Sequence, residues 1–164
     1  MNTDKLKIRL ELFDPNLVKT TSEKFIMEET ITDGYAKVDL HVQNYSILFE
    51  KVDKHVLGYL KLNNRSDFVL FEYKKEHWIP HIFEFKRTIN KKNFEHSKLQ
   101  FLGGLQNALA FAGVLGISLS LGETVFYSVY RNDNISGGVN PVKIRYEMHR
   151  HHGDGHKNMG QEIY

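Results

Sequence analysis

Two apolar, β-rich runs divided by a polar patch constrain the fold of this chain more than any other feature. The runs are 68–71 (FVLF) and 82–85 (IFEF), and the patch is 74–77 (KKEH). Phenylalanine, valine and isoleucine favour strands, so this arrangement predicts a β-hairpin. The segment 94–114 follows, with apolar side chains at spacings of three and four, which predicts a long amphipathic helix.

The remaining segments predict an α/β fold, with a mixed β-sheet and the long helix packed on one face. We expect Asn93 to cap the helix. Pro80 lacks a backbone donor and indicates a strand start or a local bulge. The stripe expected to face the core consists of Leu102, Leu105, Leu109 and Ala112. Further strands are predicted over 7–13, 35–42, 123–131 and 142–148, with a loop over 132–141, whereas 46–52 fits either a strand or a helix.

The length of 164 residues fits a single domain. We expect that domain to span 1–148, and 149–164 to form a polar, His-rich and mobile tail. The composition, 41% hydrophobic and 26% charged, is that of a globular protein and excludes a wholly disordered chain. Cysteine is absent, which excludes disulfides, cysteine metal sites and thiol nucleophiles.

The first residues contain no apolar run of the length that a signal peptide needs, and 99–121 is too polar for a membrane span. We therefore expect a cytoplasmic protein with no membrane role. The net charge of +2 permits a nucleic-acid partner but does not require one. The sequence has neither a Gly-x-Ser-x-Gly elbow nor a phosphate-binding P-loop, so it favours neither a serine hydrolase nor an ATPase.

The register of the predicted hairpin brings charged side chains together. If Tyr73 pairs with Trp78, then Asp67 falls opposite Glu84 and on the same face of the sheet. Lys86, two residues after Glu84, shares that face. We expect Phe68, Phe83 and Phe85 to project from the other face and to pack against a layer of helix.

Two adjacent carboxylates are costly unless a cation lies between them. Asp67 and Glu84 are therefore candidate ligands for Mg²⁺ or Mn²⁺, which retains water and phosphate oxygens in its other positions. Such an ion suits hydrolysis of a phosphodiester. Lys86 would place a positive charge near the attacking water or the phosphate.

This pattern resembles the PD-(D/E)xK nuclease superfamily, which has a restriction endonuclease-like fold. The resemblance covers 53–115, and Ser66 stands where the family name has proline. It implies that Asp67 and Glu84 bind the metal and that Lys86 is the catalytic lysine. Gln100, in the context 97–101 (SKLQF), resembles a glutamine that orients a phosphate or water. The family often adds an upstream acid to the metal site, for which Glu50 and Asp53 both remain open, with Asp53 taken as the candidate metal ligand.

The function implied by this resemblance is metal-dependent hydrolysis of DNA, as an effector in prokaryotic antiviral defence. A domain of this size also suggests a homodimer or a subunit of a larger defence complex. Basic residues near the predicted site in sequence are expected to contact the DNA backbone. They are Lys74, Lys75, Arg87, Lys91, Lys92 and Lys98.

Other interpretations stay open. The same fold would serve as an inactive module that binds nucleic acid or a protein, as a nuclease acting on RNA, or as a sheet with an ordinary cross-strand ion-pair group. Glu72-Tyr73-Lys74 is a second Glu-x-Lys triplet, with Asp53 as its first acid, but a strand rather than a helix follows it. The tail histidines could bind a metal, although weak incidental affinity is the simpler interpretation. The residues concerned are His149, His151, His152 and His156, with Asp154.

Overall fold

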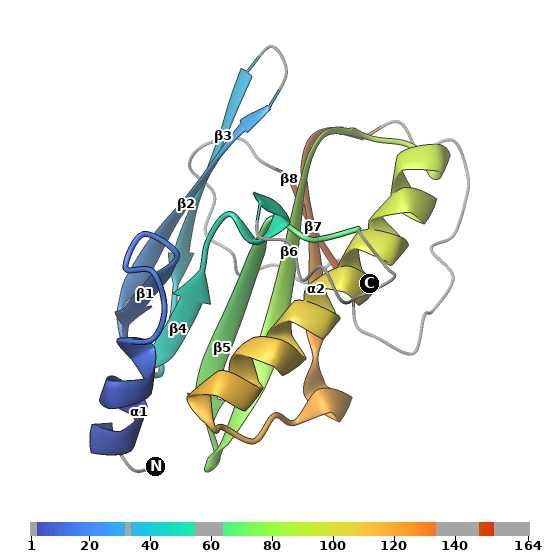
Figure 1. Ribbon diagram of the computed structural model, residues 1–164. Helices are drawn as coiled ribbons and strands as arrows, with labels where there is room; N and C mark the ends of the chain where they lie inside the picture. The colour runs from blue at the N-terminus through green and yellow to red at the C-terminus, as the bar shows by residue number, and fades with distance from the viewer. Residues whose placement is uncertain (1–2, 32–33, 55–63, 134–147, 153–164) are drawn as a thin grey trace.

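The computed structural model describes residues 3–31, 34–54, 64–133 and 148–152. Within these ranges, six strands form one sheet in the order β1-β4-β5-β6-β7-β8, and two more form the separate hairpin β2-β3 (Figure 1). The pairs β1-β4, β4-β5 and β5-β6 are antiparallel, whereas β6-β7 and β7-β8 are parallel. The strands of the sheet are β1 (Val18–Thr21), β4 (Ser46–Phe49), β5 (Phe68–Lys74), β6 (His77–Ile89), β7 (Val125–Asp133) and β8 (Met148–His152).

Three layers result from this arrangement. The helices α1 (Thr3–Leu10) and α2 (Lys91–Leu115) lie on one side of the sheet. The hairpin formed by β2 (Lys24–Ile31) and β3 (Gly34–His41) packs on the other side. Short 3-10 helices, η1 (Val52–Lys54) and η2 (Leu121–Glu123), follow β4 and precede β7. The predicted mixed sheet with a long helix on one face is therefore confirmed.

The central hairpin, β5 and β6, has the predicted register. Tyr73 pairs with Trp78, and Phe68 pairs with Phe83. Pairing extends to Lys74 and His77, so the turn contains only Lys75 and Glu76, at φ 49° and 68°. Two successive residues with positive φ form the tight turn that matches the twist of a hairpin.

Pro80 lies inside β6, opposite Phe71, without the bulge or strand start that the sequence indicated. The backbone N–H of Trp78 points away from β5, to the Ser118 carbonyl. Pairing with β7 begins only at His81. Residues two apart direct their N–H groups to the same side of a strand, so the nitrogen of Pro80 also points away from β5. It lies before the residues of β6 that pair with β7, so the hydrogen that proline lacks is not needed for that pairing.

The long helix is confirmed, but its cap and its buried face differ from the prediction. Asn90, not Asn93, is the N-cap, since its side chain accepts a hydrogen bond from the Asn93 N–H at 2.9 Å. Leu102 and Leu109 are 49% and 47% exposed. The helix instead faces the sheet with a mixture of aromatic and small residues: Ser97, Phe101, Gly103, Gly104, Asn107, Ala108, Phe111, Ala112 and Leu115.

The N-terminal segment is also different, because 7–13 does not form a strand. Its first residues belong to α1, in which Leu6 is buried and Leu10 packs against the same core. These two leucines lie four residues apart, the spacing of one helix face. Ile8, whose alternation with Leu10 suggested a strand, is exposed.

Several further strand predictions are confirmed in part. Strands β3 and β7 occupy most of the predicted 35–42 and 123–131, and β4 forms within the ambiguous 46–52. Strands β1 and β2 were not predicted. Residues 149–152, assigned to the tail by the sequence, belong to β8, whereas 142–147 and 153–164 lie outside the described residues.

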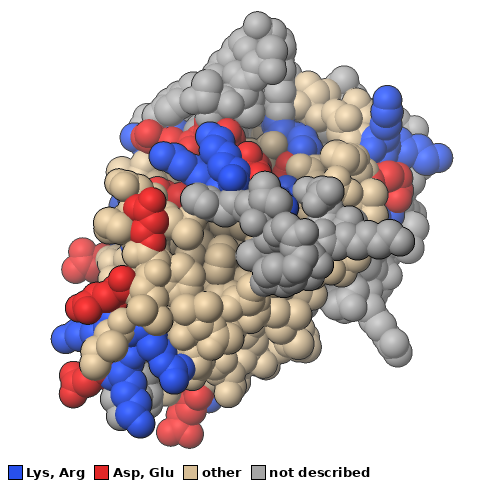
Figure 2. All heavy atoms as spheres, viewed as in Figure 1, with Lys and Arg blue, Asp and Glu red and all other residues tan. Residues whose placement is uncertain are grey.

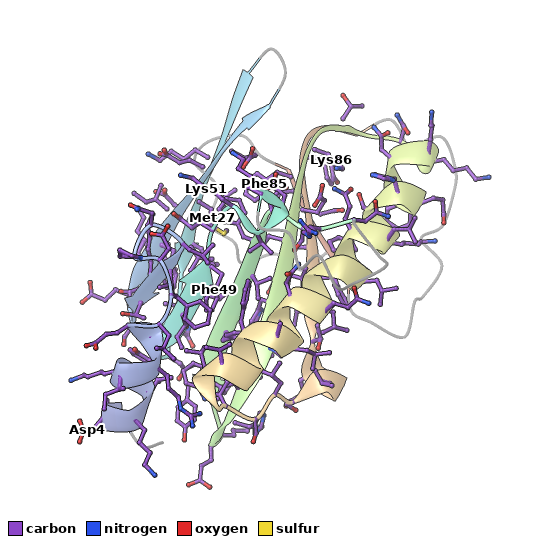
Figure 3. The ribbon with its side chains drawn as sticks, viewed as in Figure 1. Asp4, Met27, Phe49, Lys51, Phe85 and Lys86 are labelled. Atoms are coloured by element: carbon purple, nitrogen blue, oxygen red, sulfur yellow. The ribbon has the colours of Figure 1, made fainter. Side chains whose placement is uncertain are left out.

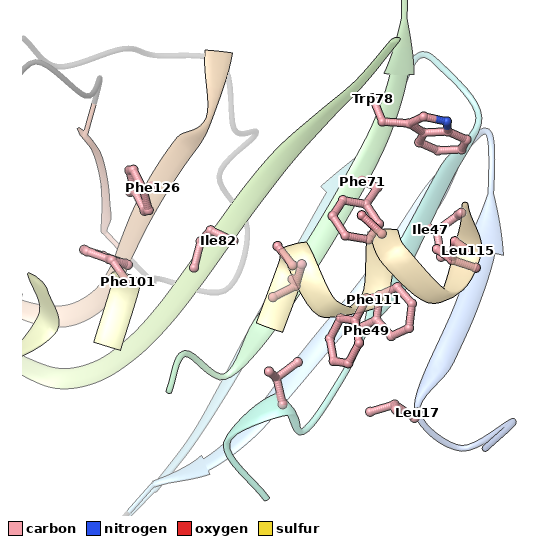
Figure 4. Close-up of a cluster of buried hydrophobic side chains, with 14 of the residues drawn as sticks. Leu17, Ile47, Phe49, Phe71, Trp78, Ile82, Phe101, Phe111, Leu115 and Phe126 are labelled. Atoms are coloured by element: carbon pink, nitrogen blue, oxygen red, sulfur yellow. The ribbon is translucent and has the colours of Figure 1, made fainter. Parts of the chain in front are cut away.

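Two apolar clusters hold the layers together. The first joins the sheet to the helices, with Phe49 stacked on Phe111 at 4.3 Å between ring centroids (Figure 4). The second lies on the opposite face and contains Phe68, Phe83 and Phe85. These three rings pack against β2-β3 and not against a helix, so the expectation of a helical layer there was wrong. The reason is that β2 and β3 bring their own apolar side chains, Phe25, Met27 and Leu40, to this face.

Over the described ranges, none of the helices combines the length and apolar character that crossing a membrane requires.

Candidate functional site

Asp67 lies immediately before β5 and is fixed by its neighbours on both sides. Its N–H donates to the Phe83 carbonyl at 3.1 Å, and its carbonyl accepts from the Val52 N–H at 3.0 Å. Its carboxylate Oδ2 accepts a hydrogen bond from the backbone N–H of Phe85 at 2.6 Å. Asp67 therefore links the start of β5 to both β6 and η1.

Glu84 lies on β6, close enough to Asp67 for the two charges to interact, and on the face covered by α2, which it shares with Ile82. The pairing of β5 with β6 ends at Phe68 and Phe83, one residue before Asp67. Its side chain is only 1% exposed. The Lys86 ammonium donates to Oε1 of Glu84, while Oε2 is buried without a hydrogen-bond partner among the described residues. Figure 3 shows Lys86 beside the end of β6, where the chain turns into α2. The structure thus brings Asp67, Glu84 and Lys86 together as the sequence predicts.

The two carboxyl groups hold protons more tightly than usual. Burial, and after it the Asp67 charge, raises the pKa of Glu84 to about 8, although Lys86 opposes the rise. Burial likewise raises the pKa of Asp67 to about 7, against the lowering effect of its hydrogen bond from Phe85. Buried acids that repel each other provide the electrostatic setting that a bound cation relieves.

Gln100 reaches this site from α2. Its Nε2 donates to the Arg65 carbonyl at 3.3 Å, and its Oε1 is buried without a partner in the described part of the chain. The Gln100 amide also acts to lower the pKa of Glu84. The structure therefore places Gln100 close to Glu84, and its role in orienting a phosphate or water stays a prediction.

The two candidate upstream acids, Glu50 and Asp53, have different surroundings. Glu50 points elsewhere, since its Oε1 accepts from the Lys19 ammonium at 2.7 Å. Asp53, in η1, lies near enough to Asp67 for its charge to raise the pKa of that carboxyl. Asp53 is therefore the upstream acid whose charge acts on Asp67. Among the described residues, however, no third acid is close enough to share a metal with Asp67 and Glu84, so the expectation that Asp53 is a metal ligand is not supported.

A further acid, Glu29 on β2, was missed by the sequence analysis. Its charge raises the pKa of Asp67, and burial and Asp53 raise the pKa of Glu29 itself. Phe25 and Met27 are buried in the structure, and Glu29 continues their alternation along β2, a strand that the sequence analysis did not predict. The site thus collects side chains from β2, η1, β5, β6 and α2.

The predicted DNA-binding cations are not all near the site. Lys74 and Lys75 lie at the β5-β6 turn, roughly 20 Å from the other end of the hairpin at 3.3 Å per residue. This corrects the expectation that they border the acids. Lys91 and Lys92 are exposed in the first turn of α2, and Lys98 is paired with Glu95 at 2.7 Å. The side chain of Arg87 lies outside the described residues.

Charged side chains of both signs gather over the end of the molecule where β6 passes into α2, above a broad uncharged surface (Figure 2). Glu72, the acid of the alternative triplet, is not part of this group. It lies toward the other end of the hairpin, where hydrogen bonds from His81 and then Asn44 lower its pKa to about 2. The second Glu-x-Lys triplet therefore lacks an adjacent buried acid in the described residues.

The carboxylate oxygens of Asp67 and Glu84 suit a hard divalent cation that takes few of its ligands from the protein. Among the described residues, no group of three or more histidine, aspartate or glutamate side chains is close enough to share a metal. Asp67 and Glu84 would hold the ion, with water and substrate oxygens in the other positions, as Mg²⁺ prefers. The buried and unpartnered Oε2 of Glu84 is the atom that most needs such a ligand.

Comparisons with models of known protein families, with curated proteins and with solved structures found no match.

Proposed function

We propose that this protein is a metal-dependent nuclease that hydrolyses phosphodiester bonds of DNA, with Asp67, Glu84 and Lys86 at its centre. The observation that carries the proposal is the proximity of the buried Glu84 and the half-buried Asp67, both of raised pKa, to a lysine. Side chains that serve only stability are rarely arranged so, because burying like charges together destabilises the fold.

Each residue has a role that its surroundings support. Asp67 and Glu84 hold Mg²⁺ or Mn²⁺, which activates water and polarises the phosphate. Lys86, held by Glu84, supplies positive charge where the phosphate becomes more negative. Gln100 orients a phosphate oxygen or water from α2, and Asp53 and Glu29 add negative charge at the rim, which favours retention of the cation.

The order of elements supports a restriction endonuclease-like fold within this proposal. An acid at the start of one strand, Glu-x-Lys on the next strand and a long helix after it are the features on which the resemblance to the PD-(D/E)xK superfamily rests. The antiviral role remains an expectation of that resemblance. The cytoplasmic location and assembly into a dimer or larger complex remain expectations from the first residues and the size of the domain.

Incubation of the purified protein with plasmid and linear DNA in Mg²⁺, Mn²⁺ or EDTA tests the proposal. Wild type is expected to cleave DNA only with a divalent cation. Glu84→Gln keeps the size of the side chain and removes its charge, and is expected to abolish cleavage. Glu72→Gln is the matched control, since it changes an acid near the other end of the same hairpin and should cleave as wild type does.

The outcomes separate the alternatives. Equal cleavage by wild type and Glu84→Gln indicates a contaminating nuclease and overturns the proposal. Binding of DNA without cleavage under any metal condition favours an inactive module of the same fold. Parallel reactions with single-stranded DNA and RNA reveal an RNA-directed nuclease if only RNA is cut.

A further inference from the structure

Ser128, on β7, lies directly beside Glu84. The two residues are partners across the parallel pairing of β6 and β7. Partnered residues of neighbouring strands point to the same face, so Ser128 shares the face covered by α2 with Glu84. Asp67 flanks Glu84 on the β5 side, and Ser128 therefore flanks it on the opposite side.

Three buried polar atoms around this point have no hydrogen-bond partner among the described residues. They are Oε2 of Glu84, Oε1 of Gln100 and Oγ of Ser128, which come from β6, α2 and β7. Ser128 is 0% exposed, so water at the surface does not satisfy its hydroxyl. The carboxylate and amide oxygens are acceptors, whereas the Ser128 hydroxyl can donate. Buried polar groups are almost always bonded, and this set has a matching donor and acceptor on neighbouring strands.

We infer that Ser128 is a positioning residue for Glu84. Neither its hydroxyl nor Oε2 of Glu84 has a hydrogen-bond partner in the described structure, and we expect the two groups to turn into a hydrogen bond that fixes the carboxylate when a cation binds. Lys86 already restrains Oε1, and Ser128 stands on the neighbouring strand as the donor that would restrain Oε2. An oxygen that accepts one hydrogen bond keeps a lone pair for a cation. The inference rests on the proposed function, because the orientation of Glu84 matters most if Glu84 binds a metal ion.

Binding of Mn²⁺ to the full chain, measured by the loss of the free-ion electron paramagnetic resonance signal, tests this role without reference to nuclease activity. Ser128→Ala removes only the hydroxyl. Groups that orient metal ligands typically change metal affinity about 10- to 100-fold, so we expect at least about tenfold weaker Mn²⁺ binding. Ser46→Ala is the matched control, because Ser46 is also 0% exposed and is also a cross-strand partner of a glutamate, Glu72, at the other end of the sheet.

The unfolding temperature of the metal-free proteins separates a positioning role from a structural one. Weaker Mn²⁺ binding by Ser128→Ala alone, with an unfolding temperature close to that of Ser46→Ala, supports the inference. If Ser128→Ala does not fold, Ser128→Cys retains a weak donor and is expected to bind Mn²⁺ with intermediate affinity. Wild-type Mn²⁺ affinity in either variant overturns the role of Ser128 and leaves the proposed function standing. No Mn²⁺ binding by the wild type overturns both.

Discussion

Glu84 combines three conditions that conflict in a protein without a ligand: near-complete burial, a neighbouring acid and one carboxylate oxygen without a partner in the described structure. The ion pair with Lys86 relieves only part of the cost, since the pKa of Glu84 stays raised despite it. At the scale of single residues, this conflict is what a bound cation resolves.

Lys86 gives the first prediction at this scale. Lys86→Met keeps the length and apolar stem of the side chain but removes the charge that meets the phosphate. Loss of one electrostatic contact in a catalytic site costs about 10²–10³ in rate, and we expect a decrease of that size in the cleavage rate constant. Binding of DNA, followed by fluorescence anisotropy in Ca²⁺ to suppress cleavage, should weaken by less than about tenfold. A cleavage rate close to wild type would show that Lys86 is not catalytic.

Asp53 and Glu29, the two acids whose charges act on Asp67, give a second prediction. Asp53→Asn and Glu29→Gln should each weaken Mn²⁺ binding and lower the pKa of Asp67, because both charges raise it. Glu50→Gln is the control, since Glu50 is engaged with Lys19. The pKa of Asp67 can be followed by ¹³C NMR of labelled aspartate. If neither the Mn²⁺ affinity nor the pKa of Asp67 changes in these variants, Asp53 and Glu29 do not belong to the site.

The sequence could predict the contact between Asp67, Glu84 and Lys86 because a hairpin register links residues close in the chain. It could not predict Glu29 or Ser128, whose positions depend on how β2 and β7 pack against distant segments. Glu50 and Asp53 were equivalent in sequence, and only the geometry of the chain after β4 distinguishes them. Lys51, at φ 54°, adopts a left-handed conformation between the two acids and turns the chain toward η1.

At the scale of elements, β5-β6 was predictable and the orientation of α2 was not. A hairpin needs only local alternation and a turn, which its sequence contains. Helix α2 has apolar residues on two faces, and the exposed one carries Leu99, Leu102 and Leu109, whereas Leu115 is buried. Two glycines determine which face of α2 is buried. Gly103 and Gly104 let the helix approach the chain around Asn64 and Ser66 so closely that a side chain at either position would not fit.

This close approach predicts opposite effects for two glycines of α2. A Cβ on Gly104 would lie 2.3 Å from Ser66 Oγ and 2.5 Å from Ile82 Cγ2, whereas a Cβ on Gly113 would meet nothing within 4 Å. Gly104→Ala should lower the free energy of unfolding by about 1–3 kcal/mol through overpacking. Gly113→Ala should raise it by about 0.5–1 kcal/mol through helix propensity. Urea denaturation measures both, and equal effects would contradict the packing described for α2.

At the scale of the whole molecule, the raised pKa values of Asp67 and Glu84 link folding to pH. Both values exceed those of the unfolded chain, so the folded protein retains protons that the unfolded chain releases. The resulting stabilisation is full below about pH 4 and is lost as pH rises through about 7 to 8. A divalent cation should replace it at high pH, because it binds the ionised acids.

In EDTA, we therefore expect the free energy of unfolding to be lower at about pH 8.5 than at about pH 5.5, by roughly 3 kcal/mol or more from these two acids. Mn²⁺ should restore stability at the higher pH and have little effect at the lower one. Glu84→Gln should reduce both the pH dependence and the effect of Mn²⁺. Stability that rises with pH to the same extent in wild type and in Glu84→Gln would contradict this linkage.

Anomalous X-ray diffraction from crystals grown with Mn²⁺ tests most directly whether Asp67 and Glu84 share a cation. The account predicts an anomalous peak between the two carboxylates, at about 2.0–2.3 Å from an oxygen of each, with Lys86 adjacent. Crystals in which Mn²⁺ occupies only other positions, with these two carboxylates lacking a common ion, would contradict it.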